Sequence, residues 1–153
     1  QYSDWLQGVG FQRQSLAEED ARQVLSAQPA AISCRLDTVN RGRFSGDPIR
    51  IAADELGTLE FGGWARLAGM ASTGFLSFRE QGPFGRDHVY RFAAGLPRPD
   101  VARRFGEQFA AVGFRGNLDV GQLHRGNYRL ALQFTGPGDE WFACDDAFRL
   151  VVF

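Results

Sequence analysis

The segment AISCRLD at residues 31–37 decides the fold of this chain, because its side chains alternate between apolar and polar types. Ile32, Cys34 and Leu36 fall on one parity, and the polar side chains between them fall on the other. A period of two residues indicates a β-strand with one buried face. The segment follows Pro29, so the change from helical to β periodicity is placed at residue 30.

Seven further alternating or apolar segments follow, most of them separated by clusters of Gly, Pro, Asn or Asp. They are residues 49–53, 58–67, 74–79, 88–93, 113–120, 128–135 and 141–153. Short strands at this spacing, without long helices between them, are typical of antiparallel β folds. We therefore expect a mainly β domain over residues 30–153, an antiparallel β-sandwich of Ig-like or jelly-roll-like type.

Two stretches have helical periodicity instead. Residues 1–29 are expected to form an N-terminal helical segment, in which Ser15 and Glu18 have the spacing of a capping box and Pro29 stops the helix. Between two of the strands, Pro99 suits a first helical turn and Gly113 a C-terminal cap, with apolar residues three or four apart between them. This run predicts one short crossover helix, which Gly106 tends to break into two turns.

Length and composition indicate one globular domain: the chain has 153 residues, of which 44% are hydrophobic and 13% aromatic. No apolar run approaches the roughly 20 residues of a membrane span, although the chain begins at Gln1 and a membrane anchor outside this segment stays open. The 17 basic residues, all arginines, are spread along the chain against 18 acidic ones. Because nucleic-acid binders gather excess positive charge on one face, the sequence argues against a nucleic-acid partner.

The two cysteines, Cys34 and Cys144, lie far apart in the sequence and belong to no CxxC pair. With only two histidines elsewhere, the chain has no ligand spacing for a structural zinc site, and no metal or cofactor is expected. Two alternatives remain, a disulfide or two unrelated buried thiols. A disulfide favours export to the periplasm or cell envelope, whereas free cysteines favour the cytoplasm.

No pattern in the sequence predicts catalysis. Adjacent carboxylates such as those of Asp145 and Asp146 point to opposite faces of a strand, so they do not converge on one substrate atom. His88 lies on the parity of Tyr90 and Phe92, where a packed histidine is more common than a catalytic base, and His124 falls in a predicted turn. GxSxG, P-loop, GxGxxG and HExxH motifs are all absent. We expect a domain that is not an enzyme by itself.

Trp64 is the first candidate ligand-binding residue. If its strand alternates without interruption, Trp64 shares the outer parity with Glu60 and Arg66 and offers a ring on which a sugar can stack. A bulge at Gly62 and Gly63 would instead turn Trp64 into the core, which is the commoner position of a tryptophan between two sheets. The sequence leaves both alternatives open.

Trp141, with Asp139 and Glu140, forms a second candidate ligand-binding group, since an aromatic residue beside acids in a loop suits contact with hydroxyl groups. The simpler interpretation is that Trp141 begins the last strand. Arg98 and Asp100 flank Pro99, where Asp100 suits the positive end of a helix and Arg98 can pair with a carboxylate across the loop. We interpret this pair as a structural motif.

The order of SCRLDTVN (33–40), LEFGGWARL (59–67), RPDVARRF (98–105) and GFRGNLDVGQLHRGNYRLAL (113–132) resembles a β-sandwich accessory domain of bacterial glycosyltransferases and other surface-polysaccharide biosynthesis proteins. The resemblance covers residues 31–153, and its motifs look like fold-defining positions rather than a catalytic set. It implies a noncatalytic, carbohydrate-binding accessory domain of a bacterial surface-polysaccharide or glycosyl-transfer system, periplasmic or associated with the cell envelope. The partner would be a glycan. The alternative is a protein-interaction module that docks a glycosyltransferase or a polysaccharide-assembly protein through its N-terminal helices.

Overall fold

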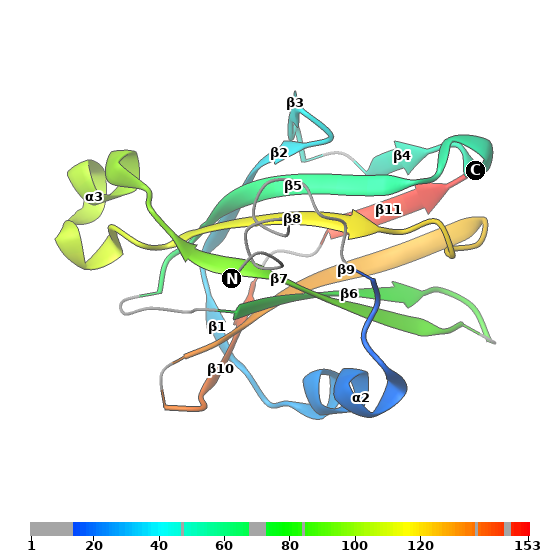
Figure 1. The fold of residues 1–153 in the computed structure, drawn as a ribbon, viewed down its shortest axis with the longest axis horizontal. Coiled ribbons are helices and arrows are strands. Elements are labelled where there is room, and N and C mark those ends of the chain that lie inside the picture. Colours follow the sequence, from blue (N-terminus) through cyan, green and yellow to red (C-terminus); the bar gives the residue numbers. More distant parts are fainter. Residues whose placement is uncertain (1–13, 47, 68–72, 84, 137, 146–147) are drawn as a thin grey trace, which may run out of the picture.

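Strands make up most of the described part of the chain (Figure 1). The computed structural model describes residues 14–46, 48–67, 73–83, 85–136, 138–145 and 148–153. The strands are β1 (Ala30–Ile32), β2 (Cys34–Val39), β3 (Gly42–Arg43), β4 (Ile49–Ile51), β5 (Thr58–Ala65), β6 (Thr73–Glu80), β7 (Asp87–Leu96), β8 (Gly113–Asp119), β9 (Gly126–Thr135), β10 (Trp141–Cys144) and β11 (Phe148–Val152). The helices are α2 (Glu18–Ser26) and α3 (Pro99–Phe105), and two short 3-10 turns are η1 (Ala53–Glu55) and η2 (Glu107–Phe109).

The described strands form one 11-stranded, mostly antiparallel sheet that curls into a half-barrel. Its order is β1-β10-β9-β6-β7-β8-β5-β2-β3, with β11 beside β9 and β4 beside β11. The mainly β, antiparallel class predicted from the sequence is therefore present. The two separate sheets of a sandwich are not, because the ten-residue strand β7 pairs with β6 on one side and β8 on the other and joins the two halves.

The two halves diverge between β7 and β8. These strands pair from Ala93 opposite Arg115 to Leu96 opposite Gly113, whereas β8 continues to Asp119 paired with β5 alone. The first half of β7 is thus left with a free edge on the β8 side. The pairing of β7 with β8 shifts register between Ala94 and Leu96, close to this divergence.

The chain before α2 occupies the free edge of β7. Ser15 forms a β-bridge with Tyr90, and the N–H of Leu16 donates to the carbonyl of Val89 at 2.6 Å. Helix α2 then begins at Glu18 with Ala17 as a cap that makes no side-chain hydrogen bond. The predicted capping box from Ser15 is therefore wrong, because Ser15 is held in extended conformation by strand pairing. Residues 1–13 of the expected N-terminal helical segment lie outside the described residues.

Strands β1 and β2 connect the two ends of the sheet. β1 pairs with β10 in parallel, and β2, which follows after the single residue Ser33, pairs with β5. At this junction Cys34 and Cys144 form a disulfide with their Cα atoms 5.4 Å apart, so of the two alternatives for the cysteines the structure contains the bridge. The bridge links segments that are 110 positions apart in sequence.

The core lies on the inner face of the curled sheet and is rich in aromatic rings. Phe92 stands edge-on to Phe61 and Phe134, with ring centroids 5.1 and 5.8 Å apart, and Phe114 packs against the same group. Gly74 leaves the space that the Phe92 ring fills, since a Cβ there would lie 2.2 Å from the ring. Removing a ring of this kind from a packed core typically costs about 3–5 kcal/mol, so these residues hold the half-barrel together.

The two helices lie at separate places, α2 beside β6 and β7 and α3 beyond the ends of β7 and β8 that it connects (Figure 1). Ala21 and Val24 of α2 are buried against Phe75 of β6 and Val89 of β7. α3 begins with Pro99 in its first turn as predicted, and ends at Gly106, whose φ of +118° breaks the run before η2. The expected helix therefore does not reach Gly113, which instead begins β8. No helix among the described residues is long and apolar enough to cross a membrane.

Candidate functional site

The structure does not bring the sequence-predicted ligand residues together. Trp64 lies in β5, with Arg66 just after the strand, whereas Trp141 begins β10 and Asp139 and Glu140 lie in the turn before it. Four strands separate β5 from β10 in the sheet order. The two tryptophans belong to different hydrophobic clusters, one beside α3 and the other beside α2. They therefore form two surfaces rather than one site.

Trp64 faces the outer side of the sheet. Burial alternates along the whole of β5, with Leu59, Phe61, Gly63 and Ala65 on the inner face and Trp64 on the outer face. The irregularity in pairing lies in the neighbouring strand, between Leu36 and Thr38 of β2, and not at Gly62 and Gly63. Gly63 instead permits a close approach, since a Cβ there would lie 2.0 Å from the carbonyl oxygen of Arg35. Of the two positions left open by the sequence, Trp64 takes the outer one.

The indole of Trp64 is half-buried beside α3. Its ring lies 5.5 Å from that of Phe105, centroid to centroid, with the planes tilted by 40°. Guanidinium groups stack on the same cluster, because Arg66 lies 5.0 Å and Arg104 5.1 Å from the centroid of Phe105. Phe109 supplies a second ring 5.7 Å from Arg66. We call Trp64, Arg66, Arg104 and Phe105 the Trp64 surface: two half-buried rings, with the exposed guanidinium groups of Arg66 and Arg104 over the ring of Phe105.

Arg98 fixes α3 next to this surface. Its Nε and Nη2 donate to the two carboxylate oxygens of Asp100 at 2.9 and 2.8 Å, and Nη1 donates to Asp37 at 2.9 Å. Asp37 is the residue that the register shift of β2 leaves unmatched, so the bulge supplies the second carboxylate. The hydrogen bonds with Asp100 and Asp37 raise the pKa of Arg98 against the opposing effect of burial, and Arg98 holds the pKa of Asp100 well below its usual range. This geometry is that of a structural clamp between the sheet and α3.

Trp141 and its neighbours have local structural partners. The Trp141 ring lies 5.4 Å from that of Phe75 and packs beneath α2 in the same cluster as Val24. Glu140 accepts a hydrogen bond from the N–H of Gly138 at 2.9 Å, and Asp139 takes a φ of +62° at the tip of the turn. Asp139 and Glu140 therefore stabilise the β9–β10 turn, and Trp141 contributes to the surface on which α2 packs.

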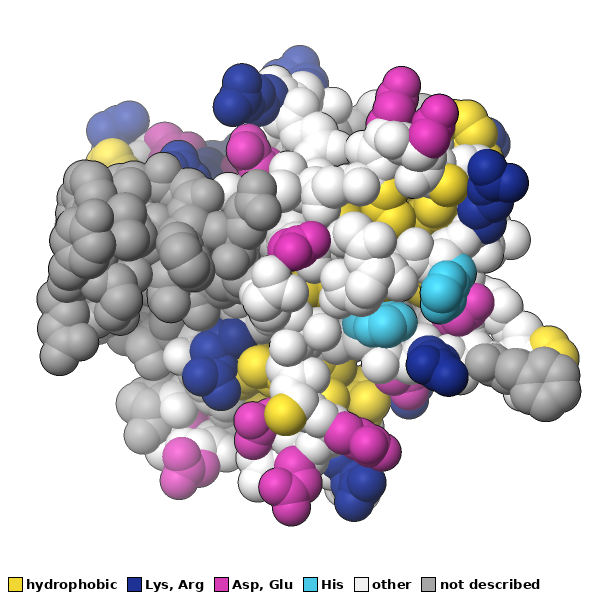
Figure 2. All heavy atoms as spheres, turned by 45° about the vertical axis from the view of Figure 1, so that its right-hand side comes forward, with side chains coloured by type: hydrophobic (Ala, Val, Ile, Leu, Met, Phe, Trp, Pro, Cys, Tyr) yellow, Lys and Arg dark blue, Asp and Glu magenta, His cyan; other side chains and the backbone are white. Residues whose placement is uncertain are grey.

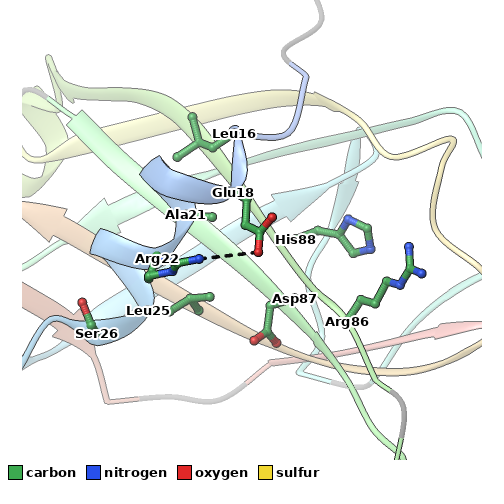
Figure 3. A pocket seen from close by; sticks show the side chains of 9 residues that line it. All are labelled: Leu16, Glu18, Ala21, Arg22, Leu25, Ser26, Arg86, Asp87 and His88. Atoms are coloured by element: carbon green, nitrogen blue, oxygen red, sulfur yellow. Dashed lines mark ion pairs between the residues drawn. The ribbon is translucent and has the colours of Figure 1, made fainter.

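A groove that the sequence did not indicate runs between α2 and the start of β7 (Figure 3). It has a volume of about 730 Å³ and is lined by Leu16, Glu18, Ala21, Arg22, Leu25, Ser26, Arg86, Asp87 and His88. Glu18 and Arg22 project over it from α2 and pair with each other at 3.6 Å, both exposed to solvent. The groove depends on where α2 docks, so no local motif predicts it. Its lining combines charged side chains, the imidazole of His88 and an apolar floor, and includes no Phe, Tyr or Trp.

The two histidines lie near each other on one face of the molecule (Figure 2). Burial lowers the pKa of His88, with Glu80 opposing this effect and His124 adding to it. Nearby, Gln122 donates to the hydroxyl of Tyr90 at 2.5 Å, and burial raises the pKa of that phenol. The part of the chain that the structure describes contains no group of three or more His, Cys, Asp or Glu side chains placed to hold a metal ion.

No protein-family model matches this sequence, and no curated protein matches it either.

Proposed function

We propose that this chain is a noncatalytic accessory domain that binds glycan at the Trp64 surface. The observation that carries the proposal is the uninterrupted alternation of β5, which sets the Trp64 ring on the outer face of the sheet with Arg66 beside it. A tryptophan in the core would have no ring face that a ligand could reach. The sequence resemblance to accessory domains of bacterial surface-polysaccharide proteins supports the same class of ligand.

The chemistry of the Trp64 surface suits a sugar. A pyranose presents C–H groups on its face, which pack on an aromatic ring, and hydroxyl groups at its edge, which need hydrogen-bond partners. The half-buried Trp64 supplies the ring, and the exposed guanidinium groups of Arg66 and Arg104, which lie over the neighbouring Phe105 ring, supply several N–H donors each. The clamp of Arg98 holds α3 in place, so the rings are positioned before any ligand arrives.

We further propose that the domain works in the periplasm or at the cell envelope of a bacterium, as part of polysaccharide assembly or glycosyl transfer. The Cys34–Cys144 disulfide is consistent with an oxidising compartment. Glycan is preferred over the alternative of docking through the N-terminal helices, because the apolar side of α2 is already used. Ala21 and Val24 are buried against the domain's own sheet, and the half-buried Leu25 packs against the same cluster, so the apolar side of α2 is largely covered.

Calorimetric titration with a panel of bacterial surface glycans tests this function. The Trp64→Ala variant is compared with Trp141→Ala, which removes a second half-buried tryptophan from the same outer face and serves as the matched control. We expect at least one glycan to bind, with Kd weakened by tenfold or more in Trp64→Ala, about 1.4 kcal/mol or greater. Trp141→Ala should bind within about twofold of the unaltered protein. Absence of binding to every glycan, or equal loss in both variants, contradicts the proposal.

A further inference from the structure

Three arginines from three neighbouring strands lie directly opposite one another on the outer face. Arg149 of β11 is opposite Arg129 of β9, and Arg129 is opposite Arg79 of β6. All three are on the parity that points away from the core, and all three are exposed. Neighbouring strands are about 4.8 Å apart, so the three side chains form a short straight row of positive charge. We call these residues the arginine row.

The arginine row is poorly neutralised within the described chain. Arg79 meets Asp87 with Nε 3.4 Å from the carboxylate, but Arg129 and Arg149 form no ion pair with any described residue. Arg50 of β4 adds a fourth exposed guanidinium one step away, since it is opposite Val151, two residues after Arg149. Like charges directly opposite each other on a sheet are destabilising. An arrangement that lowers the stability of the fold in this way points to an anionic ligand that neutralises it.

We propose that the arginine row binds an acidic polysaccharide, a chain whose sugar units carry carboxylates. The guanidinium group binds a carboxylate through two parallel N–H donors, and a row of them matches carboxylates that repeat along an extended chain. The row lies on the exposed outer face of the sheet rather than in a pocket, which suits a polymer. Phe153, 60% exposed and the only exposed large hydrophobic residue in the described chain, continues the outer parity of β11 and offers a ring face to a sugar.

Other polyanions fit this surface less well. A nucleic acid requires an excess of positive charge over the domain, whereas the net charge here is −1. A membrane surface requires several apolar side chains that insert beside the cations, whereas Phe153 is the one exposed large hydrophobic residue in the described chain and the outer neighbours of the row include the polar residue Asn127. A second copy of the chain would have to offer the acidic first turn of α2, formed by Glu18, Glu19 and Asp20. These three partners are outcomes that the experiment separates.

The arginine row is separate from the Trp64 surface. Trp64 pairs with Gly113 at one end of the sheet, whereas Arg79 pairs with Asp87 at the other. The proposal shares with the proposed function only the class of ligand, a glycan, and the two can fail independently. A domain with both surfaces would hold one chain at two places or two different glycans.

Binding of oligogalacturonate, compared with the same oligomer after methyl esterification, tests the proposal. Esterification removes the charge and keeps the sugar, so only the acidic form should bind the row. The variant R129Q/R149Q is compared with R43Q/R103Q, which removes two exposed arginines from β3 and α3. We expect R129Q/R149Q to weaken binding of the acidic oligomer at least tenfold and R43Q/R103Q to leave it within twofold. Binding should also weaken as salt increases.

Thermal unfolding gives a second readout that does not depend on the ligand. Because the double substitution relieves repulsion, R129Q/R149Q should melt at the same temperature as the unaltered protein or higher. The acidic oligomer should raise the melting temperature of the unaltered protein and of R43Q/R103Q, but not that of R129Q/R149Q. Equal binding of both oligomers, equal binding by both double variants, or a preference for DNA, for phosphatidylglycerol vesicles or for self-association overturns the proposal. Trp64→Ala should still bind oligogalacturonate, and this outcome distinguishes binding at the arginine row from binding at the Trp64 surface.

Discussion

Removing the Cys34–Cys144 disulfide is expected to lower the stability of the domain by a large and calculable amount. The bridge closes a loop of 110 residues, and the chain-entropy model gives about 5 kcal/mol for a loop of that length. For a domain of this size each kcal/mol corresponds to about 2–4 °C, so the melting temperature should fall by about 10–20 °C. The effect is large because the chain between the two cysteines is long, so the bridge removes many conformations from the unfolded state.

Urea unfolding of the variant Cys34→Ala/Cys144→Ala, followed by circular dichroism, measures this effect against the unaltered protein. The unaltered protein after reduction is the control, and it should unfold with the variant. A larger dependence on urea in the variant is also expected, since its unfolded chain is less compact. Titration of thiols in the denatured, unreduced protein should find none. A difference in stability below about 1 kcal/mol, or two free thiols per chain, refutes the reasoning.

Three further predictions concern the Arg98 clamp, the half-buried histidine His88 and the close approach at Gly63 in β5. Arg98→Ala removes three charged hydrogen bonds and should lower the free energy of unfolding, measured by urea titration, by about 2 kcal/mol. An unchanged free energy of unfolding would show that the clamp does not stabilise the fold. The pKa of His88 is lower in the folded protein, so the unfolded chain binds more protons at mildly acidic pH. The contribution of His88 to the free energy of unfolding is therefore full above about pH 6.5 and falls below it. In a series of urea midpoints at different pH, His88→Gln should remove this pH dependence. Gly63→Ala should destabilise the fold clearly in thermal melts, since its Cβ meets the Arg35 carbonyl and the Phe114 ring, and a neutral result would contradict the close approach.

The alternation of apolar and polar residues predicted the strands well, because successive side chains of a strand point to its buried and its exposed face in turn. Strands β5, β6, β7, β8 and β9 all fall within or around the segments expected from the sequence. The same rule, applied without interruption, predicted the outer position of Trp64 as one of two alternatives. The structure decides for the outer position because β5 alternates without a bulge. The bulge lies instead at Asp37 of the neighbouring strand β2, where no glycine marks it.

Features that depend on pairing between distant segments were not predictable in this way. The sequence does not show that β7 joins the two halves into one sheet, nor that Ser15 pairs with β7 instead of capping α2. The arginine row illustrates the same limit. Arg79, Arg129 and Arg149 are scattered along the chain, and only the registers of β6, β9 and β11 place them side by side. The helix break at Gly106 was predictable, because its cause is local.

The claim that the outer face near α3 carries the ligand is tested most directly by nuclear magnetic resonance of the tryptophan indole N–H groups during titration with a glycan that binds. The account predicts that the signal of Trp64 shifts in proportion to the bound fraction, while that of Trp141, packed under α2 against Phe75, stays in place. A titration in which binding moves the Trp141 signal and leaves that of Trp64 unchanged would contradict it.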